Sequence, residues 1–119
     1  MLTERHREIM DLLSTYKDAT QRMFTALKER HRVAKVPGSE TIVGRIEERI
    51  RETESEREEV IGLIERVNDP VERAILRGRY IADMTYKALA EDNHYHIRHI
   101  YKIHESALDS VDQLLRGEK

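Results

Sequence analysis

The feature that most constrains the fold of this chain is its lack of residues that interrupt helices. Its 119 residues include five Gly and two Pro. Only two stretches carry the residues that end one helix and begin another, 36–39 (VPGS) and 68–70 (NDP). An all-β sandwich or barrel needs a turn about every ten residues, so this scarcity excludes one. The sequence therefore predicts an all-α protein with three segments, at about 2–35, 39–67 and 69–119.

The first two segments carry the spacing of coiled-coil helices, with Ser39 expected to cap the second. Seam positions recur at alternating intervals of three and four residues, and several of them are polar. In segment 1 the seam is Leu2, His6, Ile9, Leu13, Tyr16, Thr20, Met23, Leu27 and Arg30, and in segment 2 it is Val43, Ile46, Ile50, Thr53, Arg57, Val60, Ile64 and Val67.

Opposite charge favours pairing these two helices with each other. Residues 1–35 hold eight Lys/Arg and five Asp/Glu, a net of +3, whereas residues 39–67 hold five and nine, a net of −4. With a short loop between them, an antiparallel hairpin is expected. The alternative is that each helix pairs with another chain. Because the seam is polar, we expect a homodimer or higher homo-oligomer formed through residues 1–67.

Segment 3 contains start signals for three shorter helices and a tight turn before the last. Three helices joined in this way have the outline of a helix-turn-helix. The expected boundaries are a first helix from Asp69 and Pro70 to about residues 82–83, a second over 86–91 capped by Thr85, a turn at Asn93-His94 in which Asn93 tolerates the left-handed conformation, and a third from about His96.

The last helix separates an apolar stripe from a polar face when it is projected on a helical wheel. Arg98 and Lys102 point outward, and Glu105 and Asp109 share that face one and two turns later. Residues 93–104 contain no acid, but they hold both of these cations, four His and two Tyr. A recognition helix meets base edges with its N-terminal turns, so acids further along would not conflict with phosphates. The inward stripe is Ile100, Ile103, Ala107, Val111 and Leu114.

The stretch from about Asp69 to Leu115 resembles the C-terminal, promoter-reading helix-turn-helix of sigma-70-type factors, their region 4. Within this group it is most similar to small bacteriophage transcriptional regulators of the ArpU and RinA type, through Tyr101-Lys102-Ile103-His104 followed by Ala107-Leu108. The wider resemblance lies in the spacing of Thr85, Leu89, Ala90, Tyr95, Ile100, Ile103, Ala107-Leu108 and Val111, and in Ala74-Ile75-Leu76 and Arg79-Tyr80-Ile81 of the first helix.

This resemblance implies a sequence-specific double-stranded DNA-binding transcriptional regulator, encoded by a phage or prophage. In that reading Arg98 and Lys102 would donate to guanine edges, and Ile97 would touch a thymine methyl group or pack in the core. Nothing resembles the sigma domain that melts promoters, so the chain is not a whole sigma factor, and RNA polymerase is a further candidate partner. The implied DNA-facing residues are His96, Ile97, Arg98, His99, Tyr101 and Lys102, with Thr85 and Lys87 meeting phosphate.

Other kinds of site receive little support from the residues. The four His between 94 and 104 lack a carboxylate to complete a metal site, so no metal or other cofactor is expected, and His104 is expected to be a hydrogen-bonded core residue. Cys is absent, and the five Ser lack a nearby His–acid pattern, so no enzymatic activity is expected.

The sequence also indicates where the protein is located and which partners it has. The first 13 residues carry acids and no long apolar run, so they are not a secretory signal, and no stretch is long enough to span a membrane. We therefore expect a cytoplasmic protein of the bacterial host cell, with residues 1–67 for interaction and residues 68–119 for DNA binding. The net charge of −2 leaves open an alternative, a protein-interaction adaptor that uses the hairpin and binds no DNA.

Overall fold

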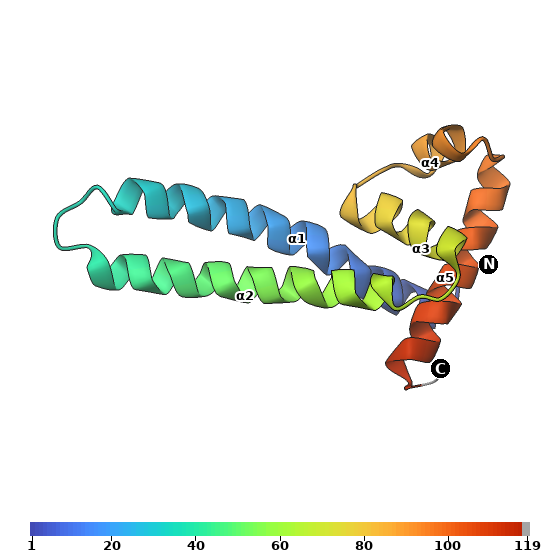
Figure 1. Cartoon of the computed structure of the whole chain (residues 1–119), viewed down its shortest axis with the longest axis horizontal. Helices are drawn as coiled ribbons and strands as arrows, with labels where there is room; N and C mark the ends of the chain where they lie inside the picture. Colours follow the sequence, from blue (N-terminus) through green and yellow to red (C-terminus); the bar gives the residue numbers. More distant parts are fainter. Residues whose placement is uncertain (118–119) are drawn as a thin grey trace.

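The computed structural model describes residues 1–117, and over that range the chain forms five α-helices and one π-helical turn (Figure 1). Two long antiparallel helices form a hairpin, and the remaining short helices pack together at its open end. This confirms the predicted all-α hairpin followed by three packed helices. The elements are α1 (Glu4–Val33), α2 (Glu40–Glu65), α3 (Pro70–Leu76) continued by the π-helical turn η1 (Arg77–Ile81), α4 (Tyr86–Asn93) and α5 (Ile97–Leu115).

Opposite charges join the two hairpin helices as their sequences predicted. Arg22 of α1 pairs with Glu56 of α2, and Arg49 of α2 donates to Glu29 of α1 at 2.9 Å. Ser39 precedes α2 as expected, but its side chain makes no capping hydrogen bond, so that part of the prediction was wrong. Ser39 is itself buried, and its carbonyl accepts the backbone N–H of Val43 at 2.9 Å.

Three polar residues of the seam, Arg57, Tyr16 and Thr20, satisfy one another inside the hairpin. The guanidinium of Arg57 donates to the Tyr16 hydroxyl at 2.9 Å and to Thr20 Oγ1 at 3.0 Å, and it lies 4.9 Å from the centre of the Tyr16 ring. A cation held by two hydrogen bonds and an aromatic face is compatible with partial burial. A second chain is therefore not needed to satisfy this polar seam, although the expected homo-oligomer stays a prediction.

Two apolar clusters at the open end of the hairpin share helix α5. The junction core is formed by α1, α2, α3, η1 and α5. It therefore includes residues from both sides of the expected boundary between residues 1–67 and 68–119. The helix-turn-helix core is smaller and is formed by α3, α4 and α5. The junction core consists of Ile9, Leu13, Val60, Leu63, Ile64, Val67, Leu76, Tyr80, Ala107, Leu108 and Val111, and the helix-turn-helix core of Ile75, Leu89, Ala90 and Ile100.

Side-chain caps begin α3 and α4 at the predicted residues. Asp69 accepts the backbone N–H groups of the first turn of α3 at 2.8 and 3.0 Å, and Pro70 takes the first helical position. Thr85 accepts the N–H of Ala88 at 3.0 Å. The residue in the left-handed conformation is His94, with φ 57°, and the prediction of Asn93 was wrong by one position. Asn93 ends α4, and its side chain donates to the Leu89 carbonyl at 2.7 Å.

Gly78 permits the close approach of η1 to α4. A Cβ atom at this position would lie 2.5 Å from Leu89 Cδ2 and 3.4 Å from Met84 Sδ. Leu89 is fully enclosed in the helix-turn-helix core and has little room to move. The absence of a side chain at residue 78 is therefore a packing requirement of the C-terminal helices.

We predict that Gly78→Ala lowers the free energy of unfolding by about 1–3 kcal/mol through overpacking. The matched control is Gly44→Ala, because an added Cβ there meets nothing within 4 Å. That variant gains helix propensity and is expected to be more stable by about 0.5–1 kcal/mol. Urea unfolding followed by circular dichroism measures both. Equal stabilisation by the two substitutions would contradict the packing described here.

Candidate nucleic-acid interface

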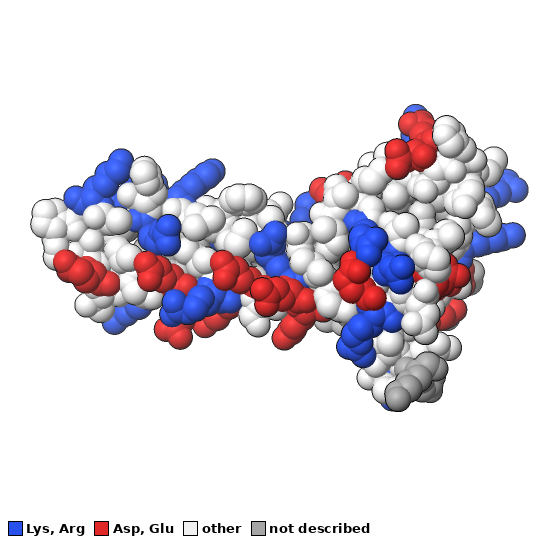
Figure 2. All heavy atoms as spheres, viewed as in Figure 1, with Lys and Arg blue, Asp and Glu red and all other residues white. Residues whose placement is uncertain are grey.

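The N-terminal half of α5 lies at the end of the molecule opposite the hairpin tip (Figure 1). Figure 2 shows Lys and Arg side chains projecting from that end, away from the hairpin. Seven of the eight residues implied to face DNA are exposed there or on the adjoining α4: Thr85, Lys87, His96, Arg98, His99, Tyr101 and Lys102.

The eighth residue, Ile97, is half-buried. It packs against the helix-turn-helix core, which α3, α4 and α5 form together. Its position in the first turn of α5 therefore anchors that turn to α3 and α4, which is the core alternative expected from the sequence. His96 caps the same turn, because its Nδ1 accepts the backbone N–H of Arg98 at 3.2 Å. The start of α5 is thus held from both sides while Arg98 stays exposed.

Aromatic contacts orient the neighbouring polar side chains. The rings of Tyr101 and Tyr86 have centroids 5.1 Å apart, and those of His99 and Tyr95 lie edge to face at 4.7 Å. Arg79 lies 4.5 Å above the Tyr86 ring. These contacts restrict the rotamers of the exposed residues, so less entropy would be lost when a ligand binds.

Arg79 and Tyr86 have a positioning role that sequence reasoning missed. Arg79 also donates to the Met84 carbonyl at 2.9 Å, which ties the loop before α4 to the end of η1. The only signal in the sequence was the Arg79-Tyr80-Ile81 match to the first helix of the sigma-like module. That match did not indicate that Arg79 stacks on Tyr86, because the contact spans two helices.

Within residues 1–117, none of the cations Arg98, Lys102 and Lys87 forms an ion pair. The acids nearest to these cations in sequence are Asp83 and Glu91 for Lys87, Asp92 for Arg98 and the half-buried Glu105 for Lys102. Figure 2 shows acidic side chains over α4. The electrostatic character of this end is therefore mixed, with free cations on α5 and acids on α4.

A shallow hollow of about 220 Å³ beside the exposed turns also contains acids. Asp69 and Glu72 line it together with His99 and Lys102. The Glu72 carboxylate is occupied, because the hydroxyl groups of Ser106 and Ser110 donate to it at 2.7 and 2.5 Å. Glu72 is thus directed along α5 toward its C-terminal half.

The acids in the second half of α5 turn toward α1. Arg5 donates to Asp112 at 2.8 Å, and His6 Nε2 lies 2.6 Å from Asp109. The Arg5 hydrogen bond is the largest cause of the lowered pKa of the Asp112 carboxyl. The helical wheel predicted that Asp109 lies on the outward face of α5. In the structure, the N-terminal turn of α1 packs beside that face. At this end of α5, Asp112 is therefore ion-paired with Arg5, and Asp109 is hydrogen-bonded to His6.

His104 is a buried, hydrogen-bonded core residue, as the sequence predicted. The Tyr80 hydroxyl lies 2.7 Å from its Nε2, and the Tyr86 ring meets it edge to face at 5.3 Å. Burial lowers the pKa of His104 to about 4, and the positive charge of nearby Arg79 adds to the effect. Burial likewise raises the pKa of Tyr80. The ring is therefore neutral at pH 7, and its Nε2 shares a hydrogen bond with the Tyr80 hydroxyl.

Residues 1–117 contain neither a metal-binding cluster nor a helix that could span a membrane. No group of three or more His, Cys, Asp or Glu side chains there could hold a metal ion. None of the helices in that range is long and apolar enough to cross a bilayer.

No protein family, curated protein or solved structure matches this chain.

The depressed pKa of His104 predicts that stability falls in acid. The unfolded chain binds a proton at this residue below about pH 6.5, whereas the folded chain does so only near pH 4. The contribution of the neutral ring is therefore complete above the unfolded pKa and is lost as the pH falls through this window. Between about pH 7.5 and pH 5 we expect a loss of about 2 kcal/mol, measured by urea unfolding.

The control for this prediction is His104→Gln, which keeps a hydrogen-bonding side chain but does not titrate. Between the two pH values, the variant is expected to lose less stability than the wild type does. The difference between the two losses should be about 2 kcal/mol, the part due to His104. An identical pH dependence in both proteins would show that His104 titrates alike in the folded and unfolded states.

Proposed function

We propose that this protein is a sequence-specific double-stranded DNA-binding regulator of transcription. The observation that carries the proposal is the exposed, acid-free start of α5, where Arg98 and Lys102 form no ion pair within the described residues. Helix-turn-helix proteins insert this part of their last helix into the major groove. The short turn between α4 and α5 and the packing of both helices on α3 support the same assignment.

The proposed division of labour follows from the chemistry of each side chain. Lys87 and Thr85, at the start of α4, would contact phosphate and set the register. Arg98 and Lys102 would donate to guanine O6 and N7, which are acceptors in the major groove. His99 and Tyr101 would add donors to bases or phosphates from a restricted orientation.

One such module carries little positive charge. Residues 68–119 hold eight Lys/Arg and nine Asp/Glu, a net of −1. With three cations, Lys87, Arg98 and Lys102, brought against the duplex, the logarithm of affinity is expected to fall with the logarithm of salt at a slope no steeper than about −3. A homodimer or higher homo-oligomer through residues 1–67, or contact with RNA polymerase, would raise affinity by effective concentration. By resemblance, such a regulator would be phage or prophage encoded and would act in the bacterial cytoplasm.

We predict distinct effects for two substitutions after preferred duplexes have been selected in vitro with the purified protein. Arg98→Ala is expected to cost about 1–3 kcal/mol of specific binding and to relax preference at one base position. Lys87→Ala is expected to weaken all sequences alike, because phosphate contacts carry no sequence information. Lys28→Ala, an exposed change near the hairpin tip, serves as the control and should leave both properties unchanged.

Unchanged affinity and preference in Arg98→Ala would contradict its assignment to a base edge.

A second candidate function, the protein-interaction adaptor, is favoured by an apolar hollow at the base of the hairpin. A gel shift with random duplex DNA over a salt titration distinguishes the two functions. Binding that weakens with salt supports the regulator, and no binding even at low salt favours the adaptor.

A further inference from the structure

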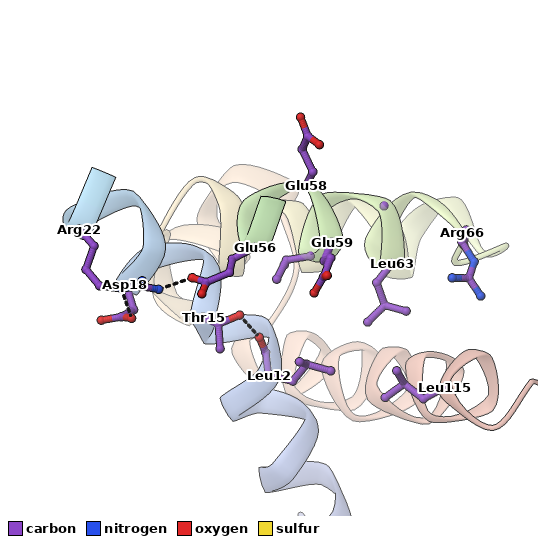
Figure 3. A pocket seen from close by; sticks show the side chains of 12 residues that line it. Leu12, Thr15, Asp18, Arg22, Glu56, Glu58, Glu59, Leu63, Arg66 and Leu115 are labelled. Atoms are coloured by element: carbon purple, nitrogen blue, oxygen red, sulfur yellow. Dashed lines mark hydrogen bonds and ion pairs between the residues drawn. The ribbon is translucent and has the colours of Figure 1, made fainter. Parts of the chain in front are cut away.

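A hollow of about 640 Å³ opens where the hairpin meets the end of α5 (Figure 3). Val60 and Leu63 are buried beneath it, and Leu12 of α1 and Leu115 of α5 stand at its edges. These two leucines are 38% and 42% exposed, although both belong to helices that have buried faces elsewhere. The hollow therefore continues the junction core to the surface as an uncovered apolar strip.

The charges around this strip are predominantly negative. Asp18, Arg22 and Glu56 form a linked group at one end, in which one cation serves two carboxylates. Glu59 also lines the hollow and forms no ion pair within residues 1–117. Arg66 stands at the opposite end. The rim therefore offers carboxylates to a ligand at one end and along α2.

The dimensions of the hollow fit a short helix. Its α2 wall runs from Glu56 to Arg66, a distance of about 15 Å at 1.5 Å per residue, or nearly three turns. Gly62 lies on this wall, where an added Cβ would meet nothing within 4 Å. A helix interior disfavours glycine, and this one has no packing role inside the chain. Its lack of a side chain leaves space for a close approach from outside.

We infer that this hollow is the docking site for an amphipathic helix of a partner protein, with apolar anchors spaced i, i+4 and i+7 and Lys or Arg beside them. The apolar strip matches the anchors, and the acidic rim selects the flanking cations. The same acids would repel nucleic acid. Docking here is independent of DNA binding, because the hollow and the exposed turns of α5 lie at different ends of that helix.

Fluorescence anisotropy with the full chain tests this docking site. The probe is a dye-labelled helical peptide of about 14 residues, with three leucines at the stated spacing and lysines at the flanking positions. The comparison peptide has Glu in place of each Lys. We expect a Kd of about 1–100 μM for the Lys peptide and binding at least about tenfold weaker for the Glu peptide. No binding at about 1 mM, or equal binding of both peptides, would overturn the inference.

Two pairs of variants locate the binding. Leu12→Ser is expected to weaken it about tenfold, whereas Ile61→Ser, at an equally exposed residue outside the hollow, should not. Glu59→Lys should weaken it about fivefold, and Glu54→Lys, on the same helix but outside the hollow, should not. Equal effects within either pair would place the peptide elsewhere and overturn the inference. Random-duplex affinity measured on Leu12→Ser should equal that of the wild type, which separates this site from the proposed DNA interface.

Discussion

Helix α5 takes part in two apolar cores at once, and the arrangement of the whole molecule depends on that double burial. Ala107, Leu108 and Val111 close the junction core against the hairpin, whereas Ile100 closes the helix-turn-helix core against α3 and α4. One continuous helix of 19 residues, about 28 Å long, therefore connects the two. The hairpin is held in one direction relative to the exposed first turns of α5, and it projects away from them (Figure 1).

The same helix separates charges that the overall composition averages out. In its C-terminal half Asp112 is ion-paired with Arg5 and Asp109 is hydrogen-bonded to His6, whereas Arg98 and Lys102 at its other end form no ion pair within residues 1–117. A chain with a net charge of −2 can therefore present two cations on one exposed helix end, with acids on the adjoining α4. We propose that the first turns of α5 contact DNA. The hairpin would raise the affinity of such a weakly charged module by pairing it with a second copy, not by touching DNA. Helix α5 would hold the DNA-contacting turns and the hairpin at a fixed separation.

Local signals in the sequence predicted most of the fold, and contacts between distant residues account for what they missed. Asp69 and Thr85 began helices as expected, because an N-cap depends only on the next three residues. The sequence predicted the left-handed conformation at Asn93, but His94 adopts it. The prediction used residue propensity alone, whereas tertiary packing sets where α4 ends. The sequence placed Arg57 in the hairpin seam and Arg79 in the first helix of the C-terminal module, but it did not indicate what either side chain contacts. Their aromatic and hydrogen-bonding partners lie on other elements, so only the folded chain identifies them as structural.

Backbone amide shifts measured by NMR during titration with random duplex DNA at low salt test the central claim most directly. If the first turns of α5 form the DNA-binding surface and the hairpin remains free, shifts will concentrate at residues 85–87 and 94–102. Residues 20–50, in the distal hairpin, will stay unchanged, and added salt will reverse the shifts. Shifts concentrated in the hairpin, or no shifts at any salt concentration, would contradict the account.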